Sequence, residues 1–148
     1  KINDTRISII KACLNRKARI NNEKEEITMT LDQGNTNQAY LCGRLFAVLE
    51  FIQQRASGGG LNRTIKDAYF SSACVRPATV FPKLVMLAQH HLAKIDGAVY
   101  FEKMMGSIMA SLNGEFPQTL SLDDQGKFII GYYQQNNSLY TKKTETQD

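Results

Sequence analysis

The sequence contains no tryptophan and only three prolines and three cysteines, and it lacks any long apolar run. A membrane-spanning helix needs about 20 predominantly apolar residues, and no stretch approaches that length. The N-terminus also lacks the charged start and apolar run of a secretory signal. These absences predict a soluble, cytoplasmic protein. Cys13, Cys42 and Cys74 are odd in number and lie far apart within apolar patterns, which is typical of small core residues rather than disulfides or ligands.

Sequence motifs of catalysis are missing as well. There is no Gly-rich phosphate loop, nucleophile elbow or zinc signature. His90 and His91 are adjacent, so they project about 100° apart on a helix, and no third spaced ligand accompanies them. Asp123 and Asp124 form an acidic pair that is explained by the preference for carboxylates at a helix start. We therefore expect no enzyme activity, no cofactor and no metal site.

Helical periodicity is the dominant pattern in the sequence. Apolar residues recur at intervals of three and four, and no alternating pattern of useful length predicts a strand. A chain of 148 residues with 43% hydrophobic content is sufficient for one core. The prediction is an all-α bundle of five or six helices forming a single domain over residues 1–148. Residues 21–34 and 137–148 are polar, a composition that permits flexibility.

The segment 36–56 is apolar on nearly every side, which predicts a helix at the centre of the bundle, capped by Asn35. Within it, Gly43 would allow a neighbouring helix to approach closely, at a propensity cost of about 1 kcal/mol. Arg44 is almost the only charge before Glu50, and pairing inside the fold is favoured over contact with nucleic acid.

Proline and serine residues predict where the later helices begin or bend. Pro77 suits the first position of a helix, whereas Pro82 predicts either a separate turn over 77–81 or a bend. Ser121 is expected to cap the last helix, with Leu122 on its buried side.

The net charge of +4 is unevenly distributed. Residues 1–20 contain six basic residues and one acidic residue, a charge of +5, so the remaining residues sum to −1. On a helix, Ile7, Ile10, Leu14 and Ala18 would form an apolar stripe, with basic residues on the other faces. The basic residues form either an ordinary solvated face or a surface that follows phosphates without reading bases.

Four sequence blocks resemble a known family in the same order. They are KACLNR (11–16), YLCGRLFAVLEFIQ (40–53), YFSSACVRPATVFPKLVMLAQHHLAKI (69–95) and FPQTLSLDDQGKFIIGYYQQ (116–135). Together they resemble the C-terminal helical region of the large subunit of the type I-C (Dvulg subtype) CRISPR surveillance complex, Cascade. In such systems this region is similar to a small subunit made from an internal translation start. The length of the chain fits that product better than the much longer large subunit.

The resemblance implies a non-catalytic subunit of an RNA-guided complex. Its partners would be the large subunit, the backbone subunits with their guide RNA, other copies of itself, and target DNA. Guide pairing reads the sequence in such complexes, while protein subunits stabilise the opened DNA through backbone contacts. The residues expected to contact DNA are exposed lysines and arginines: Lys11, Arg16, Lys17 and Arg19 on the first helix, then Arg63, Lys66, Arg76 and Lys83 around the middle.

A purely structural role is the alternative. The chain would then be a helical spacer that docks between protein subunits without productive contact with nucleic acid. Basic residues gathered into one stripe favour DNA binding, whereas basic residues scattered among acidic ones favour the spacer.

Overall fold

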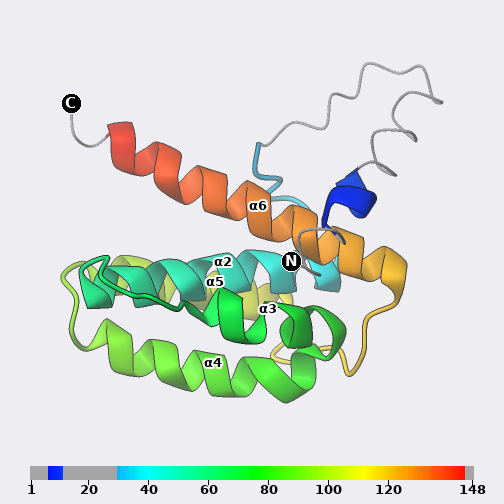
Figure 1. Ribbon diagram of the computed structural model, residues 1–148, viewed down its shortest axis with the longest axis horizontal. Coiled ribbons are helices and arrows are strands. Elements are labelled where there is room, and N and C mark those ends of the chain that lie inside the picture. The colour runs from blue at the N-terminus through cyan, green and yellow to red at the C-terminus, as the bar shows by residue number, and fades with distance from the viewer. Residues whose placement is uncertain (1–6, 12–29, 146–148) are drawn as a thin grey trace. The chain divides into compact units, whose positions relative to one another are not determined.

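The computed structural model describes residues 7–11 and 30–145, and every regular element within these ranges is a helix (Figure 1). Residues 7–11 form a short helix in a first unit of the chain, residues 1–30. The second unit, residues 31–148, holds the other helices: α2 (Gln38–Ser57), α3 (Ile65–Val75), α4 (Pro77–Leu92), α5 (Ala98–Ser111) and α6 (Leu122–Glu145). The predicted all-α bundle is confirmed.

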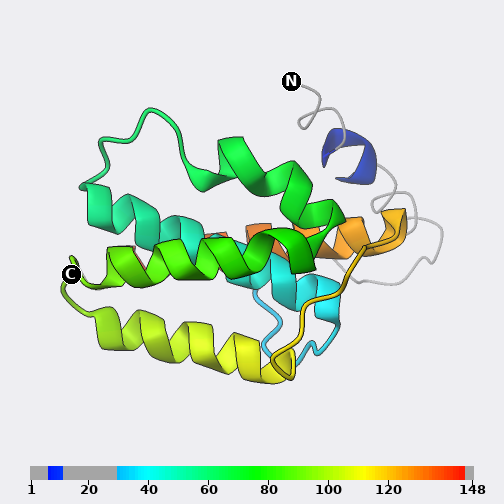
Figure 2. The same ribbon diagram turned by 90° about the horizontal axis from the view of Figure 1, so that it is seen from below.

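Helix α2 is the centre of the second unit. It begins where the Asn37 side chain accepts hydrogen bonds from the backbone N–H groups of Ala39 and Tyr40, and it ends at Gly58 with φ 70°. Helix α6 crosses one side of α2, α4 lies on the opposite side, and α3 and α5 flank it (Figures 1 and 2). The central position was correctly predicted, but the cap is Asn37 rather than Asn35, because Asn35 instead accepts a bond from the Asn37 N–H.

The crossing of α2 and α6 depends on two glycines. A Cβ added at Gly43 would lie 2.8 Å from both the carbonyl carbon of Phe128 and the backbone nitrogen of Tyr132, and one at Gly131 would lie 3.0 Å from the carbonyl carbon of Tyr40. The two backbones are therefore in direct contact, which confirms the close approach predicted at Gly43.

Aromatic rings fill the space beside this crossing. Phe46 makes edge-to-face contacts with its neighbours at centroid distances of 5.3 to 6.3 Å; these neighbours are Phe70, Phe81, Phe128 and Tyr132. At the same interface, Arg44 Nε donates to Gln135 Oε1 at 2.9 Å, and Gln135 is 2% exposed. Arg44 therefore has a partner inside the fold, as predicted, but this partner is a neutral amide rather than a carboxylate.

Two local predictions concern the later helices, and the one for Leu122 requires correction. Helix α4 is continuous from Pro77 to Leu92 and contains Pro82, which excludes the first of the two predicted alternatives, a separate turn over 77–81. Pro82 is the sixth residue of the helix and lies on its exposed side, so it removes only one backbone bond, at a position open to water. Ser121 does cap α6, accepting from the Asp124 N–H at 3.2 Å, but Leu122 is 69% exposed and not part of the core.

Candidate nucleic-acid interface

The joint between α3 and α4 brings together two of the predicted basic residues. Arg76 is the single residue between the helices, and Pro77 begins α4 directly after it. The connection from α5 to α6 fixes this joint: Ala78 donates its N–H to the Pro117 carbonyl and Leu120 donates to the Val75 carbonyl, both at 3.0 Å. The corner is therefore held by long-range backbone bonds as well as by its own helices.

Beside this corner lies a groove of about 580 Å³ between α3 and α4. We call it the α3/α4 groove. It is lined by Tyr69, Ser71, Ser72, Val75, Arg76, Thr79, Val80 and Lys83. They include two cations, three hydroxyl-bearing residues and one phenol, and no carboxylate is among them. The groove therefore has the charge and hydrogen-bonding groups that suit an anionic ligand.

Lys83 and Tyr69 face each other across the groove. The Lys83 ammonium lies 5.2 Å from the centroid of the Tyr69 ring, within the range of a cation–π contact. Lys83 is exposed and Tyr69 is partly buried. Neither Arg76 nor Lys83 forms an ion pair within the described part of the chain.

Lys66 has a different environment from the groove cations. Its ammonium lies 5.1 to 5.8 Å from three ring centroids, those of Phe70, Tyr132 and Tyr133, and it donates to the Tyr133 hydroxyl at 3.5 Å. The side chain is only partly exposed. Lys66 therefore stabilises the packing of α3 on α6 and is a weaker candidate for contact with DNA than Arg76 or Lys83.

The remaining predicted contacts are more dispersed. Arg63 is exposed in the connection just before α3 and does not line the groove. Lys11 lies on the short helix 7–11, in the first unit of the chain. Arg16, Lys17 and Arg19 lie outside the described residues. The structure thus brings together Arg76 and Lys83 out of the eight predicted positions.

Sequence reasoning missed the uncharged members of the groove. Tyr69, Ser71, Ser72 and Thr79 were not singled out as candidate contacts. The available signal was spacing: Arg76, Thr79 and Lys83 are three and four residues apart and so share one side of α4. Helix α3 contributes the opposite wall through Tyr69, Ser71 and Ser72, a pairing that the sequence did not reveal.

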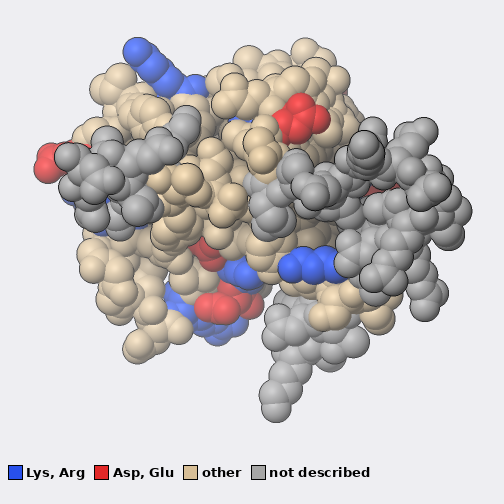
Figure 3. Space-filling model, turned by 90° about the horizontal axis from the view of Figure 1, so that it is seen from above, with Lys and Arg blue, Asp and Glu red and all other residues tan. Residues whose placement is uncertain are grey.

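The face seen from above differs from the groove (Figure 3). On that face blue and red side chains mix in a group near the lower centre, and further blue and red side chains lie singly at other places between uncharged surface. This face therefore presents no continuous basic stripe among the residues that are coloured.

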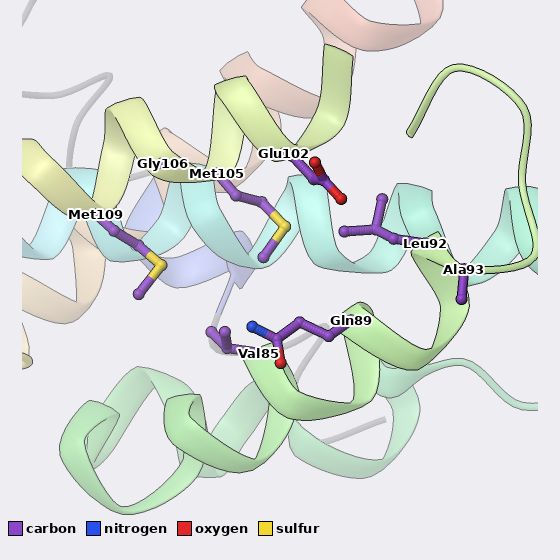
Figure 4. A pocket seen from close by; sticks show the side chains of 8 residues that line it. All are labelled: Val85, Gln89, Leu92, Ala93, Glu102, Met105, Gly106 and Met109. Atoms are coloured by element: carbon purple, nitrogen blue, oxygen red, sulfur yellow. The ribbon is translucent and has the colours of Figure 1, made fainter. Parts of the chain in front are cut away.

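A second groove of about 420 Å³ lies between α4 and α5 (Figure 4). We call it the α4/α5 groove. It is lined by Val85, Gln89, Leu92, Ala93, Glu102, Met105, Gly106 and Met109. Glu102 is the one charged residue of this lining, Gln89 is polar but neutral, and the other lining residues are apolar. Two of its members are the flexible side chains of Met105 and Met109, a composition that suits adaptable protein contacts.

Elsewhere among the described residues, burial shifts the pKa values of His91 and Cys42. No group of three or more histidine, cysteine or acidic side chains there could hold a metal ion. Burial lowers the pKa of His91, with smaller contributions from Lys94 and His90, so His91 is neutral at pH 7. Burial raises the pKa of the Cys42 thiol to about 12, which leaves it unreactive as a nucleophile. No described helix combines the length and apolar character required to cross a bilayer.

The described residues form an all-α fold with a groove whose two cations and hydroxyl groups suit an anionic ligand. The model of the CRISPR-associated protein (Cas_Csd1) family matches residues 1–140, and the chain belongs to this family. It therefore belongs among the proteins of CRISPR surveillance complexes of the Cascade type. No curated protein matches the chain.

Proposed function

We propose that this chain is a non-catalytic small subunit of a type I-C CRISPR surveillance complex. In that role it holds the displaced DNA strand of an opened target through contacts with the sugar–phosphate backbone. Its partners are the large subunit, the backbone subunits with guide RNA, and further copies of itself, in the cytoplasm. Sequence is read by the guide RNA, so the protein needs only to favour the opened geometry.

The α3/α4 groove is the observation that carries this proposal. Between residues 61 and 92 the chain has four basic residues, Arg63, Lys66, Arg76 and Lys83, and one acidic residue, Asp67. Asp67 is engaged in the capping box of α3, where it accepts from the Thr64 N–H at 3.0 Å. The region has a local charge of +3, and the groove itself contains Arg76 and Lys83 without an acidic residue, which favours phosphate contact over a scattered, solvated surface.

The test is opening of target DNA by the reconstituted complex. Opening is measured as the permanganate reactivity of displaced-strand thymines, over about 50 to 200 mM salt. Omission of the chain should abolish stable opening. Replacing Arg76 and Lys83 by Gln should reduce the slope of log K against log salt by about 1.4, since each single-strand phosphate contact contributes about 0.7. A matched control, Lys94→Gln with Lys103→Gln, removes two exposed charges outside the groove and should retain the wild-type slope.

The N-terminal cations require a separate variant. Changing Arg16, Lys17 and Arg19 to Ala should also flatten the salt dependence if this segment follows phosphates. Wild-type opening by both the N-terminal and the groove variants would show that these charges are ordinary solvated surface.

The spacer role is the second candidate, and the α4/α5 groove favours it. Four exposed apolar side chains occur on the same two helices: Met86 and Leu87 on α4, and Val99 and Tyr100 on α5, which are 36 to 62% exposed. An apolar groove and exposed apolar residues together suit contact with another protein. A complex that assembles and opens DNA normally with the groove charges removed would assign the chain to this role.

A further inference from the structure

We infer that the α3/α4 groove is a seat for one nucleotide of single-stranded DNA, in which Tyr69 stacks on a base while Arg76 and Lys83 bind the flanking phosphates. This inference rests on the proposed function and specifies the ligand of the same surface. Three features of the groove support it: its donors, its ring and its size.

The donors are side chains, because the backbone at this corner is already occupied. Pro77 has no N–H, the Ala78 N–H bonds to the Pro117 carbonyl, and the Thr79 N–H bonds to the Arg76 carbonyl at 3.1 Å. The start of α4 therefore has no free amide in its first three positions to hold a phosphate. The groups available to bind a phosphate are therefore the Arg76 guanidinium, the Lys83 ammonium and the nearby hydroxyl groups. Contacts of this kind do not depend on the base sequence.

The ring distinguishes this groove from a simple basic patch. Lys83 lies above Tyr69, and an exposed cation–π contact is weaker than the stacking of a base on an aromatic side chain. A base can therefore take the place of the ammonium over the ring. The displaced ammonium, on its flexible four-carbon stem, is then available to a phosphate.

The size of the groove sets the form of the ligand. The groove volume of about 580 Å³ falls in the range of small-ligand sites, and its lining includes one aromatic ring and two cations. A base in a duplex is stacked on its neighbours and cannot cover Tyr69, whereas an unpaired base can. The groove should therefore favour single strands over duplexes.

The test is fluorescence anisotropy of the full chain with a labelled oligothymidine of about 12 nucleotides, a length within single-strand site sizes. Tyr69→Leu should weaken binding about tenfold, while Tyr69→Phe should keep affinity within about twofold because the ring is retained. Tyr100→Leu removes a tyrosine that is 50% exposed on α5 and serves as the matched control, with wild-type affinity expected. Binding of a duplex of equal length should be unchanged by Tyr69→Leu.

The charge variants complete the test. Arg76→Gln with Lys83→Gln should reduce the salt slope by about 1.4, and Lys94→Gln with Lys103→Gln should not. Circular dichroism at 222 nm identifies any variant that has lost its fold, and Tyr69→Phe keeps the stacking test valid in that event. Equal oligothymidine binding by wild type and every folded groove variant would overturn the nucleotide seat.

One further result separates the seat from the wider function. Wild-type protein that binds no oligothymidine at low salt would also overturn the seat. The proposed function would then be decided independently by DNA opening in the reconstituted complex.

Discussion

Substituting Gly43 by alanine should strongly destabilise the fold, although alanine is the better helix former. The added Cβ would overlap the Phe128 carbonyl oxygen and lie 2.8 Å from two further backbone atoms of α6. Ordinary contact begins at about 3.4 Å, so these two atoms alone require the helices to separate by at least about 0.6 Å. A gap of about 0.5 to 1 Å forfeits a quarter to a half of the dispersion energy of the atoms along it. Overpacking of this kind costs about 1–3 kcal/mol or more, which exceeds the gain in propensity of about 1 kcal/mol.

The matched control is Gly106→Ala in α5. A Cβ at Gly106 meets nothing within 4 Å, so this change should gain helix propensity alone and stabilise the protein by about 0.5–1 kcal/mol. Urea unfolding followed by circular dichroism at 222 nm would measure both variants, with the slope m checked for two-state behaviour. Gly43→Ala with a midpoint at or above that of wild type would refute the close-packed crossing. A stabilised Gly106→Ala alongside a destabilised Gly43→Ala would confirm that position, and not residue type, decides the effect.

Three further predictions concern buried polar groups. Arg44→Ala should cost about 1–3 kcal/mol in urea unfolding, because Gln135 Oε1 loses its donor, yet it should leave the salt slope of DNA binding unchanged. Tyr132→Phe removes the hydroxyl that donates to the buried Glu50 carboxylate and should cost about 1.5–3 kcal/mol; an unchanged midpoint would contradict this account. Because the pKa of Cys42 is raised from 9.0 to about 12, its contribution to stability is present below pH 9 and falls by about 1.4 kcal/mol per pH unit above it. Cys42→Ala should remove that part of the alkaline loss, and equal pH profiles for the two proteins would argue against it.

The central helix was predictable because the apolar pattern of its own sequence indicates that it is buried. A segment that is apolar on nearly every side, such as 36–56, can only be satisfied at the middle of a bundle. Gly43 could likewise be identified as a point of close approach. Its partner Gly131 could not, because one sequence does not say which helices cross.

The candidate site was predictable only in part, for a related reason. Arg76 and Lys83 were found by charge, since exposed cations follow from composition and helical spacing. The groove that unites them needs α3 as its second wall, and its corner is fixed by bonds from Pro117 and Leu120, some 40 residues away in the chain. Polar residues such as Ser72 and Thr79 have no individual signal in the sequence, because a surface hydroxyl and a ligand-facing hydroxyl occur in the same patterns.

Helix α4 takes part in both candidate surfaces, and this arrangement makes the two functions separable. Its residues Thr79, Val80 and Lys83 line the basic groove, whereas Val85, Gln89 and Leu92 line the apolar one. At 100° per residue these two sets fall on either side of the buried strip that carries Phe81 and Leu84. One continuous helix therefore presents the groups proposed to bind DNA along one side and those proposed to bind protein along the other.

Substitutions on the two sides of α4 should then have different effects in the assembled complex. Lys83→Gln should weaken the hold on the displaced strand with the subunit still in place. Gly106→Leu, which fills the α4/α5 groove from an exposed and open position, should instead reduce the amount of subunit retained in the purified complex. Loss of DNA opening in proportion to the lost subunit, with the slope of log K against log salt unchanged for the complexes that retain it, would show that docking and strand holding are distinct. A changed salt slope in Gly106→Leu would show that both properties depend on one surface.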